Sequence, residues 1–220
     1  DGKGQSLLKT AEEAERAWQT MRESPLILES FVRFDRELSL VAARARGGET
    51  VFYPLTENHH REGILRWSLA PAPGVTARLQ EAAESCALKI FEALDYAGVL
   101  TIEFFHAEGE LLANEMATRV HNSGHWTIEG AFTSQFENHL RAISALPLGS
   151  AAARGCSGMV NFIGTLPDLN KVLSVPGARV HIYGKEARVG RKLGHATVCA
   201  PHPEALAGPL KALRDLASCA

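Results

Sequence analysis

The stretch VLTIEFFHAEGELLANEM, Val99 to Met116, predicts two β-strands joined by a tight turn. Glu103 interrupts the first apolar run, and a three-residue loop centred near Gly109 would place it opposite Glu115. Like charges directly opposite each other are destabilising, so this arrangement suggests a divalent cation, which reverses the sign of the interaction. The alternative is one buried and one exposed acid on opposite faces, because a one-residue change of register separates them.

Further elements are expected on both sides of this hairpin. Thr10 and Glu13 form a capping-box pattern before a helix at 11–21, and Gly47 and Gly48 suit a turn between strands at 37–45 and 50–55. The remaining predicted helices are at 79–98, 133–144 and 203–217, and the remaining predicted strands are at 25–32, 159–164, 178–184 and 194–200. This pattern predicts an α+β fold, with a larger domain at 1–150 and a small β-rich domain at 151–220.

The composition limits the class of protein. The 23 basic and 25 acidic residues nearly balance, which disfavours a general nucleic-acid binder. The four cysteines form no CxxC pair and suit a reducing cytosol. The chain contains no apolar run of the roughly 18 residues that cross a bilayer, so we expect a cytoplasmic protein without a membrane partner.

The stretch HNSGHW, which begins at His121, is rich in groups that can bind an anion. Gly124 and the preceding Asn-Ser argue against a helix that would bring two imidazoles to one zinc ion. An arginine beside imidazoles and an amide better suits a carboxylate, bicarbonate or phosphate. The candidate residues are Arg119, His121, Asn122 and His125. A hydrogen-bonded surface loop remains the alternative.

Two further stretches could contact phosphate. The first is the glycine-rich DGKGQS at the start of the chain, whose backbone N–H groups could approach a phosphate; a plain turn is the alternative. The second is YGKEARVGRKLGH, in which four cations could bind a phosphate or simply form a solvated face: Lys185, Arg188, Arg191 and Lys192.

These stretches occur in an order that is similar to a known family. NEMATRVHNSGHWT, then SQFENHLRAI, then YGKEARVGRKLGH closely resembles the 5-(carboxyamino)imidazole ribonucleotide synthase family of ATP-grasp enzymes, and VFYPLTENHHREGIL supports the match. The resemblance covers nearly the whole chain. It implies a homodimeric carbon–nitrogen ligase of purine biosynthesis. Such an enzyme uses ATP, Mg²⁺ and bicarbonate to carboxylate aminoimidazole ribonucleotide by way of carboxyphosphate.

The resemblance also implies roles for individual residues. Those expected to bind ATP are Asp1, Gly2, Lys3, Gly4, Gln5 and Ser6 over the phosphates, Glu29, Ser30, Phe31 and Val32 beside the adenine, Glu37 at the ribose, and His60, Asn114 and Glu115. Glu103 and Glu115 resemble the magnesium ligands. Arg119, His121, Asn122 and His125 are expected around bicarbonate and the imidazole. Lys185, Arg191 and Lys192 are expected at the phosphate of the ribonucleotide.

Members of that family carry an α/β domain and the first part of the ATP-grasp domain before the glycine-rich loop. We therefore expect the chain to be the later part of a longer protein and to lack part of the site when isolated. Two alternatives stay open at this point. One is another ATP-grasp ligase with a different acyl acceptor, against which HNSGHW argues. The other is a non-catalytic nucleotide-binding or dimerisation module, against which the set Glu103, Asn114 and Glu115 argues.

Overall fold

The computed structural model describes residues 4–22 and 25–218. Its helices are α1 (Ala11–Met21), α2 (Ala77–Leu94), η1 (Asn122–Gly124), α3 (Thr127–Gly130), α4 (Gln135–Ile143), α5 (Leu169–Leu173) and α6 (Pro203–Ser218). Its strands are β1 (Arg36–Arg44), β2 (Thr50–Phe52), β3 (Thr56–Arg61), β4 (Ile64–Ala70), β5 (Gly98–Ala107), β6 (Glu110–Ala117), β7 (Cys156–Ile163), β8 (Arg179–Ile182) and β9 (Lys192–Ala200).

Within the described residues, the strands form one antiparallel sheet in the order β6-β5-β1-β3-β4-β7-β9-β8, with β2 paired to β1. The predicted α+β class is confirmed. The strands of the predicted C-terminal domain continue this sheet, because β7 pairs with β4 from Trp67↔Val160 to Ala70↔Ser157. Side chains on β9 can therefore share a face of the sheet with side chains on β1, β3 and β5.

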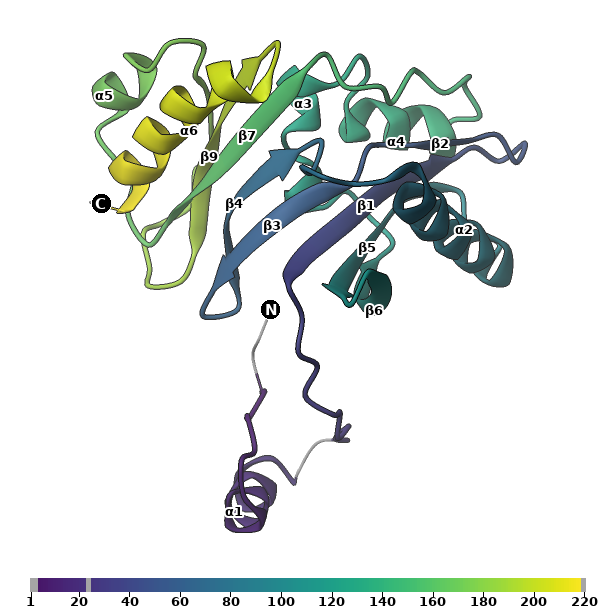
Figure 1. Ribbon diagram of the computed structural model, residues 1–220, viewed down its shortest axis with the longest axis vertical. Coiled ribbons are helices and arrows are strands. Elements are labelled where there is room, and N and C mark those ends of the chain that lie inside the picture. The colour runs from purple at the N-terminus through teal and green to yellow at the C-terminus, as the bar shows by residue number, and fades with distance from the viewer. Residues whose placement is uncertain (1–3, 23–24, 219–220) are drawn as a thin grey trace.

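Helix α2 covers one face of β1 and β5 (Figure 1). Its buried side chains recur at helical spacing and pack against alternate strand positions: Leu79, Ala83, Ala87 and Phe91 against Leu38, Leu40, Ala42, Leu100, Ile102 and Phe104. Since strand side chains alternate between faces, Ser39 and Glu103 point to the face opposite α2. The helix ends at Asp95 in a left-handed conformation (φ 44°), so our expectation that Gly98 ends it is wrong. Gly98 instead opens β5.

The C-terminal helix α6 packs on β7 and β9 at the other end of the sheet (Figure 1). Leu206, Leu210 and Leu213 recur at helical spacing within the helix predicted at 203–217, and all three are buried against this part of the sheet. Within the residues that the structure describes, no helix has both the length and the apolar character needed to cross a membrane.

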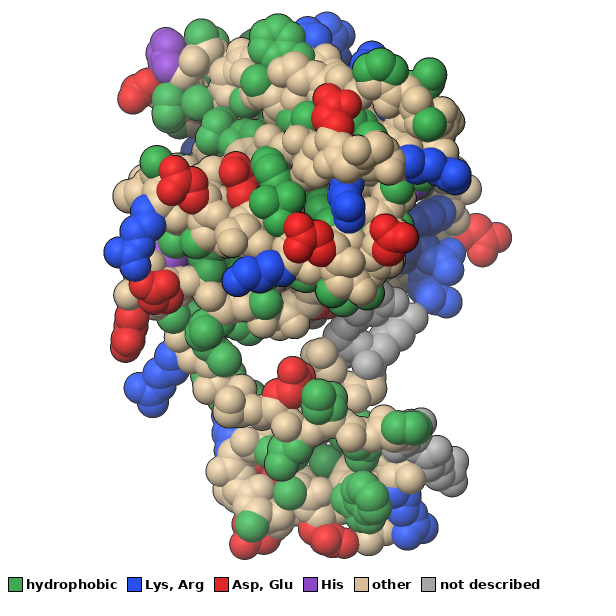
Figure 2. Space-filling view, turned by 90° about the vertical axis from the view of Figure 1, so that its right-hand side faces the viewer, with side chains coloured by type: hydrophobic (Ala, Val, Ile, Leu, Met, Phe, Trp, Pro, Cys, Tyr) green, Lys and Arg blue, Asp and Glu red, His purple; other side chains and the backbone are tan. Residues whose placement is uncertain are grey.

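The N-terminal segment projects away from the sheet, and apolar side chains lie on its surface (Figures 1 and 2). The predicted capping box of α1 is confirmed, with Thr10 and Glu13 bonded reciprocally. The strand predicted at 25–32 is wrong: Ile27 and Leu28 are 82% and 83% exposed, and the run pairs with no strand in the described part of the chain. An apolar run identifies a possible strand but not the partner that its backbone needs.

The central hairpin β3–β4 was not predicted from the sequence. Its turn at Glu62 and Gly63 has positive φ at both residues (56° and 70°), which is the geometry of a tight two-residue turn. Polar residues dominate β3, as its sequence TENHHR shows, so the strand lacks the apolar alternation that would reveal it. One of these polar residues, His60, lies beside Glu37 in the candidate site.

Candidate functional site

The two hairpin acids lie opposite each other, as predicted, but for a different reason. The turn between β5 and β6 has two residues, since Ala107 pairs with Glu110, and this register alone would place Asn114 opposite Glu103. A β-bulge between Glu103 and Phe104 shifts the pairing by one residue, so that Glu103 pairs with Glu115. One ligand atom from each of Glu103, Glu115 and His121 lies within 4.8 Å of the others.

Opposing charges surround Glu103. Burial raises the pKa of its carboxyl group, the charge of His60 lowers it, and the charges of Glu115 and Glu37 raise it again. Lys192, at the start of β9, also acts on this carboxyl group. Burial lowers the pKa of Lys192 in turn, while the charge of Glu103 raises it. Lys192 therefore lies within electrostatic reach of the acid pair as well as beside the loop that carries Lys185.

Glu37 and His60 form a pair next to these acids. Their Oε2 and Nδ1 atoms are 2.8 Å apart, which joins β1 to β3. Burial lowers the pKa of His60, but its hydrogen bond to Glu37 and the charges of Glu37 and Glu103 raise it more, so the net pKa lies above 6.5. The structure thus brings together two residues that were predicted separately as nucleotide contacts.

We expect the Glu37→Gln substitution to destabilise the protein mainly at low pH. A histidine pKa that is raised on folding stabilises the native state below the unfolded value of 6.5, and this contribution is lost as pH rises through the folded pKa. A charge-assisted hydrogen bond contributes roughly 1.5–3 kcal/mol, which corresponds to a few degrees in melting temperature.

Thermal unfolding from pH 5 to pH 8 without divalent cations measures this difference. The matched control is Glu204→Gln, because Glu204 pairs with His202 at 2.9 Å on the exposed surface. The control should show little change at any pH. A stability loss in Glu37→Gln that grows as pH rises would contradict the assignment.

A buried amide holds the HNSGHW loop. Gln135, the first residue of α4, is fully buried. Its Oε1 accepts from the backbone N–H of His121 (2.9 Å), and its Nε2 donates to the carbonyl oxygen of His121 (2.6 Å) and lies 3.1 Å from Nδ1 of His125. A Cβ on Gly124 would lie 2.6 Å from Gln135 Oε1, so a larger residue here would have to displace the Gln135 amide. Gln135 was not among the predicted site residues, since its partners lie on a loop that has no regular period.

A second amide contact ties the loop to the sheet. Asn122 and Asn161 of β7 exchange two side-chain hydrogen bonds, at 2.9 and 2.7 Å, and Asn161 also donates to the carbonyl oxygen of Leu65. The side-chain amide of Asn122 is thus already hydrogen-bonded to the side chain of Asn161. In this structure it positions the loop, and its predicted contact with bicarbonate stays a prediction.

The two loop histidines are half-buried and neutral at physiological pH. Burial lowers the pKa of His121 to about 3, with the charges of Arg119 and Lys192 lowering it further. Burial also lowers the pKa of His125 to about 4, with a contribution from Lys192. Neutral imidazoles can accept a proton or a hydrogen bond, so they do not supply the positive charge for an anion. The charges of Arg119 and Lys192 both act on His121, so these two cations could supply the positive charge.

The other predicted residues lie around this centre or outside it. Arg119 is exposed and donates to the carbonyl oxygen of Val120. Lys185 and Arg191 lie between β8 and β9. Asn114 is the additional residue of the bulge. Residues that lie in the N-terminal segment are Gly4, Gln5, Ser6, Glu29, Ser30, Phe31 and Val32, and those outside the described residues are Asp1, Gly2 and Lys3.

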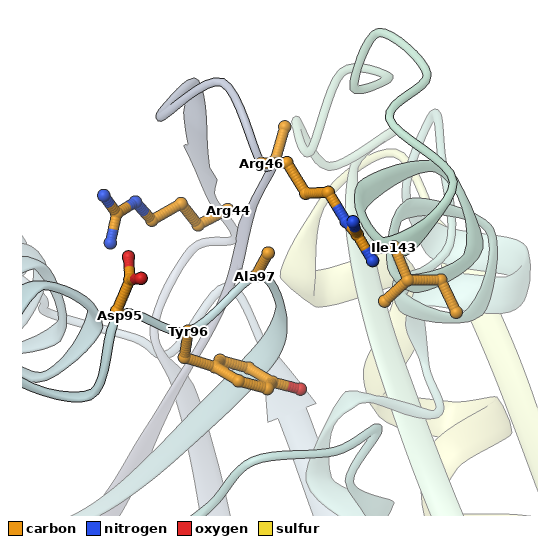
Figure 3. A pocket seen from close by; sticks show the side chains of 7 residues that line it. Arg44, Arg46, Asp95, Tyr96, Ala97 and Ile143 are labelled. Carbon is orange, nitrogen blue, oxygen red and sulfur yellow. The ribbon is translucent and has the colours of Figure 1, made fainter.

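A pocket of about 440 Å³ lies elsewhere on the molecule. Arg44, Arg46, Asp95 and Tyr96 are among its lining residues (Figure 3). Arg44 is five residues along β1 from Ser39, which pairs with Glu103, so it lies roughly 17 Å away along the strand. This pocket is therefore separate from the acid pair and its loop.

Comparison with known proteins identifies two family modules in the chain. A model described as the ATP-grasp domain matches residues 1–136, and one described as the phosphoribosylaminoimidazole carboxylase C-terminal domain matches residues 157–208. N5-carboxyaminoimidazole ribonucleotide synthase of Pseudomonas aeruginosa is 53% identical over 198 residues, which are 90% of this chain and 54% of that protein. The chain therefore spans about half the length of the curated relatives it matches.

Solved structures agree with these matches. The N5-carboxyaminoimidazole ribonucleotide synthetase of Thermus thermophilus superposes with a TM-score of 0.93 at 59% identity, covering 96% of this chain and 59% of that one. The N5-carboxyaminoimidazole synthase of Aspergillus clavatus, in complex with ADP and 5-aminoimidazole ribonucleotide, gives a TM-score of 0.87 at 34% identity, covering 94% of this chain and 58% of that one. The chain belongs to the ATP-grasp family, in the branch that carries the phosphoribosylaminoimidazole carboxylase C-terminal domain.

Proposed function

We propose that the full-length protein carboxylates 5-aminoimidazole ribonucleotide with bicarbonate, at the expense of ATP, to give 5-(carboxyamino)imidazole ribonucleotide. The main observation in support is that three sets of groups lie close enough to interact: the acid pair Glu103 and Glu115, the loop histidines, and Lys192. The names of the similar proteins indicate the substrate, and one of those structures holds ADP together with 5-aminoimidazole ribonucleotide.

The acid pair fits a magnesium ion bound to a nucleotide. Two carboxylates converge there, and Mg²⁺ prefers oxygen ligands, usually one or two carboxylates together with substrate phosphates. The buried Glu103 carboxyl group, whose pKa is raised by its surroundings, is the kind of group that a cation would stabilise in its charged form. Bound Mg²⁺ would neutralise charge on the phosphates of ATP. Glu37 and His60 would contact the nucleotide from the neighbouring strands β1 and β3.

The loop and the cations suit the binding of bicarbonate and of the ribonucleotide in the two steps of the reaction. A bicarbonate oxygen attacks the γ-phosphorus of ATP, which gives ADP and carboxyphosphate. The amine nitrogen of the ribonucleotide then attacks the carboxyl carbon, phosphate leaves, and the amine loses a proton. Arg119 would hold the bicarbonate, and His121 and His125, which are neutral, could accept a hydrogen bond or a proton. Lys185, Arg191 and Lys192 would bind the ribonucleotide phosphate.

The proposal is tested by measuring ADP formation by the full-length protein. ADP should appear only when bicarbonate, Mg²⁺ and 5-aminoimidazole ribonucleotide are all present, and omission of the ribonucleotide should reduce it to background. ADP formation that is stimulated by a different acceptor would favour another ATP-grasp ligase. Nucleotide binding without any turnover would favour a non-catalytic module.

We expect the arginine and the C-terminal cations to affect different kinetic constants. Arg119→Ala should mainly lower kcat, because it removes an interaction that strengthens as charge develops on the reacting carboxylate. Lys185→Ala or Arg191→Ala should mainly raise KM for the ribonucleotide, because a phosphate contact is common to the ground and transition states. A charge-assisted contact of roughly 1.5–3 kcal/mol corresponds to about a tenfold to hundredfold change.

Steady-state kinetics with each substrate varied in turn measure this division. Lys211→Ala is a matched control, since Lys211 is a cation that pairs with Asp215 on the exposed surface of α6. It should change neither constant. If Arg119→Ala altered only the KM for the ribonucleotide, Arg119 would have to be reassigned from the bicarbonate subsite to the ribonucleotide subsite.

We also propose a homodimer in a reducing, cytoplasmic compartment. The dimer rests on the family resemblance. The compartment is supported by the free thiols of Cys86, Cys156 and Cys199. Light scattering of the full-length protein measures its oligomeric state, and fractionation of cells shows the compartment in which it lies.

A further inference from the structure

Tyr183 lies where two parts of the proposed site meet. The ammonium nitrogen of Lys185 is 5.2 Å from the centre of its ring. The hydroxyl oxygen is 2.7 Å from Nδ1 of His195 on β9. The ring of His125, from the HNSGHW loop, meets the Tyr183 ring edge to face, with centres 6.4 Å apart and an angle of 88°. The backbone N–H of Tyr183 donates to the carbonyl oxygen of Leu193, which fixes the tyrosine beside β9.

The Tyr183 hydroxyl sets the orientation of His195. His195 is 1% exposed, and its ring centre is 5.0 Å from that of His125 and 4.6 Å from that of His181. Burial lowers the pKa of His195 to about 3 and raises the pKa of Tyr183 to about 12, so at neutral pH the imidazole is neutral and the phenol keeps its proton. A neutral imidazole that accepts from the hydroxyl at Nδ1 carries its own proton on Nε2.

The other ring nitrogen of His195 gives no competing constraint. Among the described residues, Nε2 of His195 is buried and has no hydrogen-bond partner. The contact to Tyr183 is thus the polar interaction that decides which way the ring faces. Without it, the ring could rotate by half a turn, and its packing against His125 would change with it.

The Tyr183 ring also restricts the conformations of the Lys185 side chain. Lys185 is exposed and follows Gly184, whose φ is 64°. A long side chain on such a loop has many conformations, and the attraction of an ammonium group to an aromatic face favours those that lie over the ring.

We propose that Tyr183 is a positioning residue that couples the two subsites, holding Lys185 through its ring and His125 through its hydroxyl and His195. The inference rests on the proposed function, in which Lys185 binds the ribonucleotide phosphate and His125 lies beside the reacting carboxyl group. Fixing the distance between these groups aligns the amine of the anchored ribonucleotide with that carbon. Misplacement of reacting groups by about 1 Å can cost on the order of a hundredfold in rate.

Two substitutions separate the roles of the hydroxyl and the ring. Tyr183→Phe keeps the face under Lys185 and removes the contact to His195. It should lower kcat about tenfold while leaving the KM for the ribonucleotide within about twofold. Tyr183→Leu removes both contacts, so it should show the same fall in kcat together with a KM that is about two- to fivefold higher.

Further variants distinguish positioning from a general loss of structure. Tyr53→Phe also removes a buried hydroxyl, which bonds to Asn138 and to the carbonyl oxygen of Thr133, and it should lower the melting temperature without changing KM or kcat. His195→Gln should reproduce the kcat effect of Tyr183→Phe, and the double variant should be no slower than either single variant. A double variant with fully additive losses would overturn the coupling through His195.

Nitrogen chemical shifts of the histidine rings provide a readout besides turnover. In the wild type, His195 should show an accepting Nδ1, and Tyr183→Phe should remove that signature. Wild-type protein that makes no ADP in response to the ribonucleotide would overturn the proposed function and this inference with it. Normal wild-type turnover with an unchanged kcat in Tyr183→Phe would overturn this inference alone, as would identical KM values for Tyr183→Phe and Tyr183→Leu.

Discussion

Replacing Glu103 with glutamine should make the full-length protein more stable without metal and at least roughly a hundredfold slower. The two effects have one cause. Glu103 and Glu115 pair directly across β5 and β6, and both the burial of Glu103 and the charge of Glu115 raise its pKa. The folded state therefore disfavours the charged form of Glu103 at neutral pH. A neutral side chain of the same shape should remove this penalty, and relief of a cross-strand repulsion alone contributes about 0.2–1 kcal/mol.

The same substitution removes a proposed ligand of the nucleotide-bound cation. A metal ion that neutralises charge in phosphoryl transfer stabilises the transition state by several kcal/mol, and about 2.7 kcal/mol corresponds to a factor of one hundred. Glu115→Gln should behave in the same way. Addition of Mg²⁺ with a nucleotide should raise the melting temperature of the wild type more than that of either variant.

Melting temperatures with and without Mg²⁺–nucleotide, together with kcat, measure these effects. Glu110→Gln is a matched control on the same hairpin, because Glu110 makes an exposed ion pair with Arg78 at 3.0 Å. It should leave stability and kcat nearly unchanged. A Glu103→Gln variant that is less stable without metal and fully active would show that the acid pair is structural and binds no cation.

The Gln135→Leu substitution should destabilise the protein by about 3 kcal/mol and also slow the reaction. Leucine has a similar size but cannot pair with His121. The backbone N–H and carbonyl group of His121 would each lose their bond to the Gln135 side chain. A half-buried or buried polar group without a partner costs about 1–3 kcal/mol, and two such groups are affected. Because Gln135 also contacts His125, the loop histidines should lose their fixed positions, and we expect kcat to fall about tenfold to hundredfold.

The chain contains a natural control for this experiment. Gln80 on α2 also clamps a backbone segment: it accepts from the N–H of Leu55 at 2.9 Å and donates to the carbonyl oxygen of Tyr53 at 3.2 Å. Gln80→Leu should cause a comparable loss in the free energy of unfolding without a change in kcat per folded molecule. Chemical denaturation and kinetics on both variants make the comparison. If Gln80→Leu slowed the reaction as much as Gln135→Leu, the rate loss would reflect general destabilisation.

Several features of the fold follow from the sequence because they depend on residues close together in the chain. The capping box joins Thr10 and Glu13, which are three positions apart, and the stripe of Leu206, Leu210 and Leu213 recurs within two turns of one helix. The hairpins β1–β2 and β5–β6 depend on turns of a few residues. For the site, the order of the polar stretches identified the family, and with it the residues proposed to bind each substrate.

Other features were decided by contacts between distant parts of the chain. The sequence does not show the bulge that places Glu115, rather than Asn114, opposite Glu103, and the hairpin's short turn alone predicts the wrong pair. It also does not show that β3 lies in the interior of the sheet or that residues 25–32 lack a partner strand in the described chain. Strand order depends on which backbone groups pair across the whole sheet, and local periodicity carries no information about that choice.

The site itself was assembled by tertiary structure. Lys192 comes within electrostatic reach of Glu103 from a strand 89 positions later, because β4 pairs with β7 and continues one sheet through both predicted domains. Sequence alone determined which chemical groups this protein carries and the local elements on which most of them lie. The folded sheet determined which of those groups meet, since burial, charge and hydrogen-bond partners are properties of neighbours in space.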